Sequence, residues 1–142
     1  THPNTCCYYS NLDKVERRWH EYIGDAVREK DFFSRHKNIA VWQKESGELR
    51  AVGSFLDSFH ELGITVEMGK EGRITRFDAD FLRAPGRICF GTAQRVQQLI
   101  GQSLEQLTRS FIQQSLGGGS GCAHLLDIGQ ETFGCLGQVI GV

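Results

Sequence analysis

The feature that most constrains the fold is a change of hydrophobic period along the chain. From residue 60 to residue 82, apolar and polar residues alternate, with a break at residues 69–72. Such alternation predicts β-strands with one buried and one solvated face. Because Gly72 suits a tight turn with positive φ, the runs on either side of it predict an antiparallel hairpin.

Two more strands are expected before this hairpin, at residues 39–42 and 49–56, and helices are expected after it. From Cys89 onward, apolar residues recur at three- and four-residue spacing, which is typical of amphipathic helices. A capping box indicates that the second helix begins at Ser103. Strands in a run followed by helices in a run predict an α+β fold: a small antiparallel sheet of three to four strands, then about three helices packed on one face.

The N-terminal residues complete the expected domain. Residues 10–33 combine a capping box with an apolar stripe, so they predict a helix. Residues 1–9 show no such pattern and are expected to form a mobile tail. We therefore expect a single α+β domain over residues 1–142, with the sheet at 38–82 and the helical half at 89–142.

Charge and cysteine usage restrict the partners and the compartment. The 16 basic and 17 acidic residues give a formal net charge of -1, so the chain as a whole attracts neither nucleic acid nor an anionic membrane. No apolar run approaches the roughly 20 residues that span a bilayer. The five cysteines are irregularly spaced, unlike the dense, even set of a small secreted protein. We expect a reducing, cytoplasmic location.

Candidate chemistry lies at three places in the expected fold. Cys89 follows the last strand at a helix start, where free backbone N–H groups and the helix dipole favour a thiolate. Cys122 and His124 lie at the entry to the last helix, and Asp57 and His60 lie where the second and third strands join. Thiolate, imidazole and carboxylate groups are ligands for zinc or iron. Each motif also has a purely structural interpretation: a buried thiol, a solvated helix start, and a capped turn.

The remaining cysteines are assigned no role. Cys6 and Cys7 are sequence neighbours, which rarely form a disulfide, and they lie in the expected tail. Cys135 lies near the apolar stripe of the last helix, so we expect it to pack.

Several stretches resemble an uncharacterised bacterial family, the domain of unknown function 2889. They are Phe-Leu-Asp-Ser-Phe-His-Glu-Leu at 55–62, Asp-Ala-Asp at 78–80 followed by Cys89, and Gly-Cys-Ala-His-Leu-Leu at 121–126. The last of these is similar to the Gly-Cys-Thr-His-Leu signature of that family. This resemblance implies no particular activity.

A more distant resemblance is to NifU/IscU-type iron–sulfur scaffold proteins. It rests on residues 64–74, on Cys89 and on residues 99–105. It implies a NifU/SufE-like layout, with an N-terminal helix, a small antiparallel sheet and a helical C-terminal half. Cys89 matches the second cysteine of that family and Cys122 lies near its final His-Cys pair, but its first cysteine has no counterpart here. A partner protein that donates or accepts a cluster is also implied.

The leading hypothesis is therefore a NifU-like metal-binding protein that holds zinc, iron or an iron–sulfur cluster. Cys89, Cys122 and His60 would be ligands, and Asp57 or His124 would complete the set. Two alternatives stay open. One is an enzyme in which Cys89 is the nucleophile and His60 or His124 is the base. The other is a small-ligand or protein-binding module without metal, with an apolar pocket lined by Phe77, Phe81 and Phe90. The sequence favours a non-catalytic protein and leaves the oligomeric state open.

Overall fold

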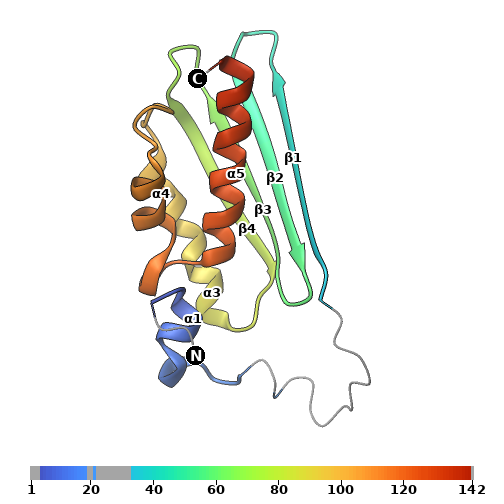
Figure 1. The fold of residues 1–142 in the computed structure, drawn as a ribbon, viewed down its shortest axis with the longest axis vertical. Coiled ribbons are helices and arrows are strands. Elements are labelled where there is room, and N and C mark those ends of the chain that lie inside the picture. The colour runs from blue at the N-terminus through green and yellow to red at the C-terminus, as the bar shows by residue number, and fades with distance from the viewer. Residues whose placement is uncertain (1–3, 19–20, 22–32, 142) are drawn as a thin grey trace.

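The computed structural model describes residues 4–18, 21 and 33–141, and its centre is a four-stranded sheet (Figure 1). The strands are β1 (Arg35–Gln43), β2 (Leu49–Asp57), β3 (Glu61–Met68) and β4 (Ile74–Arg83). They lie in the order β1-β2-β3-β4, and each pairs antiparallel with the next. The predicted α+β class and antiparallel sheet are confirmed.

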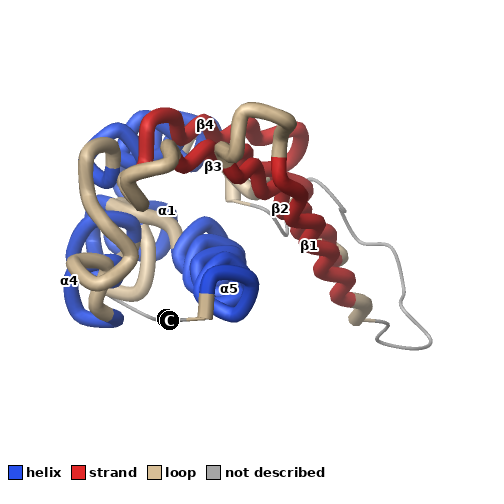
Figure 2. Tube along the Cα trace, turned by 90° about the horizontal axis from the view of Figure 1, so that it is seen from above, coloured by secondary structure: helices blue, strands red, loops and turns tan. Residues whose placement is uncertain are grey.

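Helical elements precede and follow the sheet. Before it lie α1 (Cys7–Ser10) and the 3-10 turn η1 (Leu12–Lys14). After it come α3 (Arg87–Phe90), the 3-10 helix η2 (Gly91–Leu99), α4 (Arg109–Leu116), the 3-10 turn η3 (Gly118–Ser120) and α5 (Ala123–Ile140). Figure 2 shows the helices on one side of the twisted sheet. No described helix has both the length and the apolarity needed to cross a membrane.

The alternation in the sequence produces the main core. Buried and more exposed residues alternate along β3 and along most of β2, and the buried side chains pack against α4, α5 and η2. Gly53 on β2 allows α5 to approach closely, because a Cβ there would lie 2.7 Å from Thr132 Oγ1. The start of α5 consequently lies near the end of β2 (Figure 1).

The helical half departs from prediction at its first two helices. The segment after Cys89 is mostly 3-10 helix, and α4 begins at Arg109 rather than at Ser103. The Gln106 side chain does accept a hydrogen bond from the Ser103 N–H at 2.9 Å, as in a capping box. However, Ser103 forms an isolated β-bridge with Arg73, which holds this stretch out of a helix. Thr108 is the actual N-cap, and its Oγ1 accepts from the N–H of Phe111 at 3.1 Å.

The N-terminal segment also differs from prediction. Cys6, Cys7 and Tyr8 are buried, so the mobile tail expected at residues 1–9 is wrong for these residues. Burial of this segment is reinforced by the Cys7 N–H, which donates to the Gly121 carbonyl at 2.7 Å. Among the described residues of the helix expected at 10–33, Leu12–Lys14 form the short turn η1, Val15 is extended and Glu21 is helical. Most of that range, residues 19–20 and 22–32, lies outside the described residues.

Candidate functional site

A cavity of about 220 Å³ lies where the β2–β3 turn, the start of α5 and the N-terminal segment meet. All five predicted site residues line it: Asp57, His60, Cys89, Cys122 and His124. They come from three separate segments of the chain. The fold thus brings the three segments together at one cavity, although the five side chains play different parts in it.

The turn between β2 and β3 aims Asp57 and His60 in the same direction. Asp57 is 3% exposed, and its Oδ1 accepts hydrogen bonds from the N–H groups of Phe59 at 2.8 Å and His60 at 2.6 Å. The same oxygen lies 3.0 Å from Nδ1 of the His60 ring. An aspartate that binds the backbone of its own turn in this way fixes the turn conformation. The carboxylate and the imidazole are thus held together by local structure.

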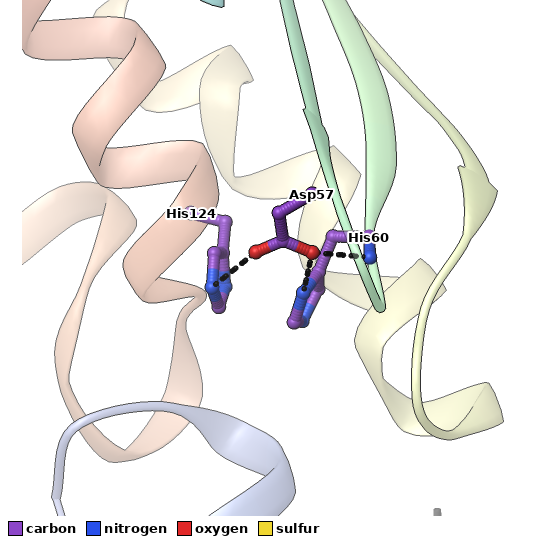
Figure 3. A group of neighbouring side chains, drawn as sticks. All are labelled: Asp57, His60 and His124. Carbon is purple, nitrogen blue, oxygen red and sulfur yellow. Dashed lines mark hydrogen bonds and ion pairs between the residues drawn. The ribbon is translucent and has the colours of Figure 1, made fainter. Parts of the chain in front are cut away.

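His124 reaches the same carboxylate from the first turn of α5 (Figure 3). Its Nε2 lies 3.6 Å from Asp57 Oδ2, and its ring stacks on His60 with 3.6 Å between centroids and 24° between planes. The edge contact with Phe55, at 5.2 Å between centroids, supports the ring from the sheet. Ligand atoms of all three residues lie within 4.8 Å of one another. We call Asp57, His60 and His124 the polar side of the cavity.

Burial sets the charge of this polar side. It lowers the pKa of His60, and it lowers the pKa of His124 to about 4 with a further contribution from the neighbouring His60. Burial alone would raise the pKa of Asp57, but hydrogen bonds and the His60 charge outweigh it, and the net pKa is lowered. At neutral pH the polar side therefore consists of two neutral imidazoles around one carboxylate.

Two arginines support the polar side, and sequence reasoning did not identify them as site residues. Arg83 donates to the carbonyl oxygens of Asp57 at 2.9 Å and Ser58 at 2.7 Å, so it fixes the turn from outside. Arg35 lies 3.8 Å from Asp57 Oδ2, and its guanidinium is 5.2 Å from the ring centroid of Phe55. Neither residue has a distinctive sequence motif. Their roles follow from the strand pairing that brings β1 and β4 to this end of the sheet.

Cys89 and Cys122 line the cavity but do not belong to the group of closely spaced ligand atoms. Cys122 is the N-cap of α5, and its Sγ accepts from the Leu125 N–H at 3.5 Å. Its burial raises the pKa of the thiol to about 11. The pKa of Cys89 is raised as well, first by its hydrogen bond with Cys7 and then by burial. The prediction that the helix start favours a Cys89 thiolate is therefore wrong, and α3 is only four residues long.

The cavity also contains residues to which the sequence assigned no role. Cys6 and Cys7 line it together with Cys89 and Cys122, and all four are buried and free of disulfides. We call these four cysteines the sulfur side of the cavity. No sequence signal pointed to Cys6 and Cys7, because residues 1–9 have no periodic pattern. Cys135, by contrast, is a partly exposed residue of α5.

The apolar pocket expected at Phe77, Phe81 and Phe90 is not formed as predicted. Phe77 is fully buried, with its ring 5.6 Å from that of Phe133, so it belongs to the core. Phe81 and Phe90 contact each other, with 6.0 Å between ring centroids.

Fold and cavity together define an α+β domain with an Asp–His–His group enclosed beside four thiols. A family model described as a protein of unknown function (DUF2889) matches residues 33–134, which is more than half of the chain, and the chain belongs to this family. The matched range contains the whole polar side. No curated protein and no solved structure matches the chain, and the NifU/IscU resemblance is not supported by these comparisons.

Proposed function

We propose that Asp57, His60 and His124 bind one divalent zinc or iron ion, with coordination positions left open to a small ligand in the cavity. The observation that carries this proposal is the convergence of one carboxylate and two imidazoles, from segments more than 60 residues apart, in a buried setting. Two histidines and one carboxylate are a donor set that suits both zinc and non-haem iron.

The spacing of the donor atoms suits a single ion. Two ligands at about 2.0 Å from a tetrahedral zinc lie about 3.3 Å from each other. The carboxylate oxygens lie 3.0 Å from His60 Nδ1 and 3.6 Å from His124 Nε2. The ligand atoms of all three residues lie within 4.8 Å of one another, and the two stacked rings would have to turn for their nitrogens to converge on one ion.

The protonation state also favours metal binding over a simple ion pair. A histidine that pairs with an aspartate as an ion usually has a raised pKa, whereas the pKa of both histidines here is lowered. Neutral imidazole is the form that ligates metal ions. Because Asp57 is already fixed by backbone N–H groups, the carboxylate needs little reorganisation to act as a ligand.

An open metal site suits a role in binding or converting a small molecule. Three protein ligands leave at least one position for water or substrate, and a zinc-bound water has a pKa of about 7. A cavity of about 220 Å³ has room for a small molecule next to the ion. An iron–sulfur scaffold is less well supported, because such clusters usually need several thiolates, and the pKa of Cys89 and Cys122 is raised. The raised pKa of Cys89 also weakens the alternative of an enzyme in which the Cys89 thiolate attacks the substrate.

Calorimetric titration of the metal-depleted protein with Zn²⁺, and anaerobically with Fe²⁺, tests the proposal. We expect one ion per chain for the wild type. His124→Ala should bind at least about 100-fold more weakly, since loss of partners outside the coordination sphere alone costs 10–100-fold. His36→Ala is the matched control, because His36 is an exposed residue of β1 and should not affect binding.

Two further measurements separate ligand loss from misfolding. Circular dichroism and thermal unfolding of each metal-free variant show whether it folds. Asp57→Asn, which keeps an oxygen acceptor for the turn, should lose affinity while it retains the fold. Absence of stoichiometric binding by the wild type would overturn the proposal, as would wild-type affinity in a folded His124→Ala protein.

A further inference from the structure

The sulfur side contains a pair of cysteines from distant parts of the sequence. Cys7 lies in α1 and Cys89 in α3, and α1 packs against α3. Cys7 Sγ lies 3.8 Å from the carbonyl oxygen of Ile88, the residue next to Cys89. Both cysteines are 4% exposed and belong to one buried cluster with Cys6 and Tyr8. Both also line the cavity, so each can meet a small molecule that enters it.

The other cavity cysteines are less well placed to react with either of these two. The Cys122 sulfur caps the N–H of Leu125 at the start of α5. Cys6 is the sequence neighbour of Cys7, and a disulfide between adjacent residues is strained. Cys7 and Cys89 are therefore the pair that the packing brings together across two elements.

We propose that Cys7 and Cys89 form a redox-active thiol pair, which hydrogen peroxide entering the cavity converts into a disulfide. The oxidant is small enough for a cavity of about 220 Å³. This inference does not depend on the metal site, because it uses neither the polar side nor a bound ion.

The chemistry balances in two steps. The Cys7 thiolate attacks one oxygen of the peroxide and the O–O bond breaks; the departing hydroxide takes up a proton to become water, and Cys7 becomes a sulfenic acid. The Cys89 sulfur then attacks the Cys7 sulfur, the S–O bond breaks, and the hydroxide leaves as a second water with the Cys89 proton. The two thiols together lose two electrons and the peroxide gains two.

The surroundings of the two thiols favour Cys7 as the residue that attacks the peroxide and Cys89 as the residue that then attacks Cys7. The hydrogen bond from the Cys89 thiol lowers the pKa of Cys7, and the same bond raises the pKa of Cys89. The thiolate is the nucleophile in such reactions. Cys7 is therefore the residue that attacks, and Cys89 is the residue that resolves the sulfenic acid.

Thiol mapping on the intact, metal-free chain tests the proposal. After treatment with one to a few equivalents of hydrogen peroxide, remaining thiols are alkylated and the protein is digested with trypsin. Cys89 then lies in peptide 88–95 and Cys7 in peptide 1–14. We expect these two peptides to be joined by a disulfide that dithiothreitol cleaves. The number of titratable thiols in denaturant should fall from the five of the reduced chain by the two that form the disulfide.

Single substitutions identify the partners. Cys7→Ser and Cys89→Ser should each reduce formation of the linked peptide at least tenfold. Cys6→Ser resolves the ambiguity within peptide 1–14 and should leave the link intact. Cys135→Ser, outside the cavity, is the matched control and should also leave it intact. Linkage that persists in Cys7→Ser would overturn the assignment, and so would oxidation of Cys7 to sulfinic acid without any link to Cys89.

Discussion

The polar side and the sulfur side of the cavity are built in different ways. On the polar side, side chains hold one another: the Asp57 carboxylate contacts both imidazoles, and the His60 and His124 rings stack. On the sulfur side, the surrounding backbone does most of the positioning, as in the contact between the Cys7 N–H and the Gly121 carbonyl. The polar side should therefore respond to changes in its own side chains, and the sulfur side to changes in the backbone around it.

The family match also separates the polar side from part of the sulfur side. Residues 33–134 contain the complete polar side, whereas Cys6 and Cys7 lie outside the matched range. All three ligands of the proposed metal site, Asp57, His60 and His124, thus lie within the part of the chain that the family model matches. The proposed thiol pair needs the N-terminal segment as well.

The largest loss of stability is expected from a substitution of Gly121, the residue that joins η3 to the Cys122 N-cap. A Cβ there would lie 2.1 Å from the Leu116 carbonyl oxygen and 2.4 Å from that of Gly117. Both contacts are with backbone, so no side chain can move away to relieve them. We expect Gly121→Ala to lower the free energy of unfolding by about 3 kcal/mol or more, measured by urea denaturation.

Gly134→Ala provides the control for this substitution. Gly134 is an exposed residue of α5, and a Cβ added to it would meet nothing within 4 Å beyond its chain neighbours and the backbone of its own helix. Alanine should therefore stabilise the helix by up to about 1 kcal/mol. A Gly121→Ala protein as stable as the wild type would show that backbone packing does not fix the sulfur side.

A smaller change in the free energy of unfolding is expected when the pH is lowered, because of His124 on the polar side. In the metal-free protein the pKa of His124 is about 4, compared with 6.5 for an ordinary histidine. Between pH 4 and pH 6.5, His124 is therefore protonated in the unfolded chain and neutral in the folded chain. Because the unfolded chain gains this proton and the folded chain does not, the free energy of unfolding falls as the pH decreases from 6.5 towards 4. We expect His124 to account for roughly 2 kcal/mol of the loss, with allowance for its partial exposure.

Unfolding of His124→Gln between about pH 7 and pH 4 isolates this contribution. The variant should lose less stability than the wild type over that range, while His36→Gln should follow the wild type because His36 is exposed. Parallel pH profiles for the wild type and His124→Gln would contradict the lowered pKa of His124. They would also remove one of the arguments for a neutral imidazole ligand.

The sequence predicted the sheet well because its signals are local. Alternation over residues 60–82 corresponds to β3 and β4, and Gly72 has the expected positive φ of 76°. The same holds for Asp57 and His60, since a four-residue turn is enough to aim both side chains together. His124 was brought to them by family resemblance and not by spacing.

The failures of prediction involve contacts between distant segments. Nothing near Ser103 indicates the bridge to Arg73 that displaces the start of α4. Nothing near Cys7 indicates that Gly121, more than 100 residues away, accepts its N–H. Nothing in the glycine run at 117–121 indicates that close backbone packing requires glycine at position 121. Long-range packing, rather than local propensity, decides these elements.

The smallest effect is expected at Cys122, where the two sides of the cavity meet. If its sulfur serves as a helix cap, Cys122→Ser keeps an acceptor for the Leu125 N–H and should change the free energy of unfolding by less than about 1 kcal/mol. Cys122→Ala loses the cap and should be about 1 kcal/mol less stable than the serine variant. Zinc stoichiometry should be unchanged in both, because the proposed ligands are Asp57, His60 and His124. Loss of zinc from both variants, with the fold intact, would instead make Cys122 a ligand and would join the sulfur side to the metal site.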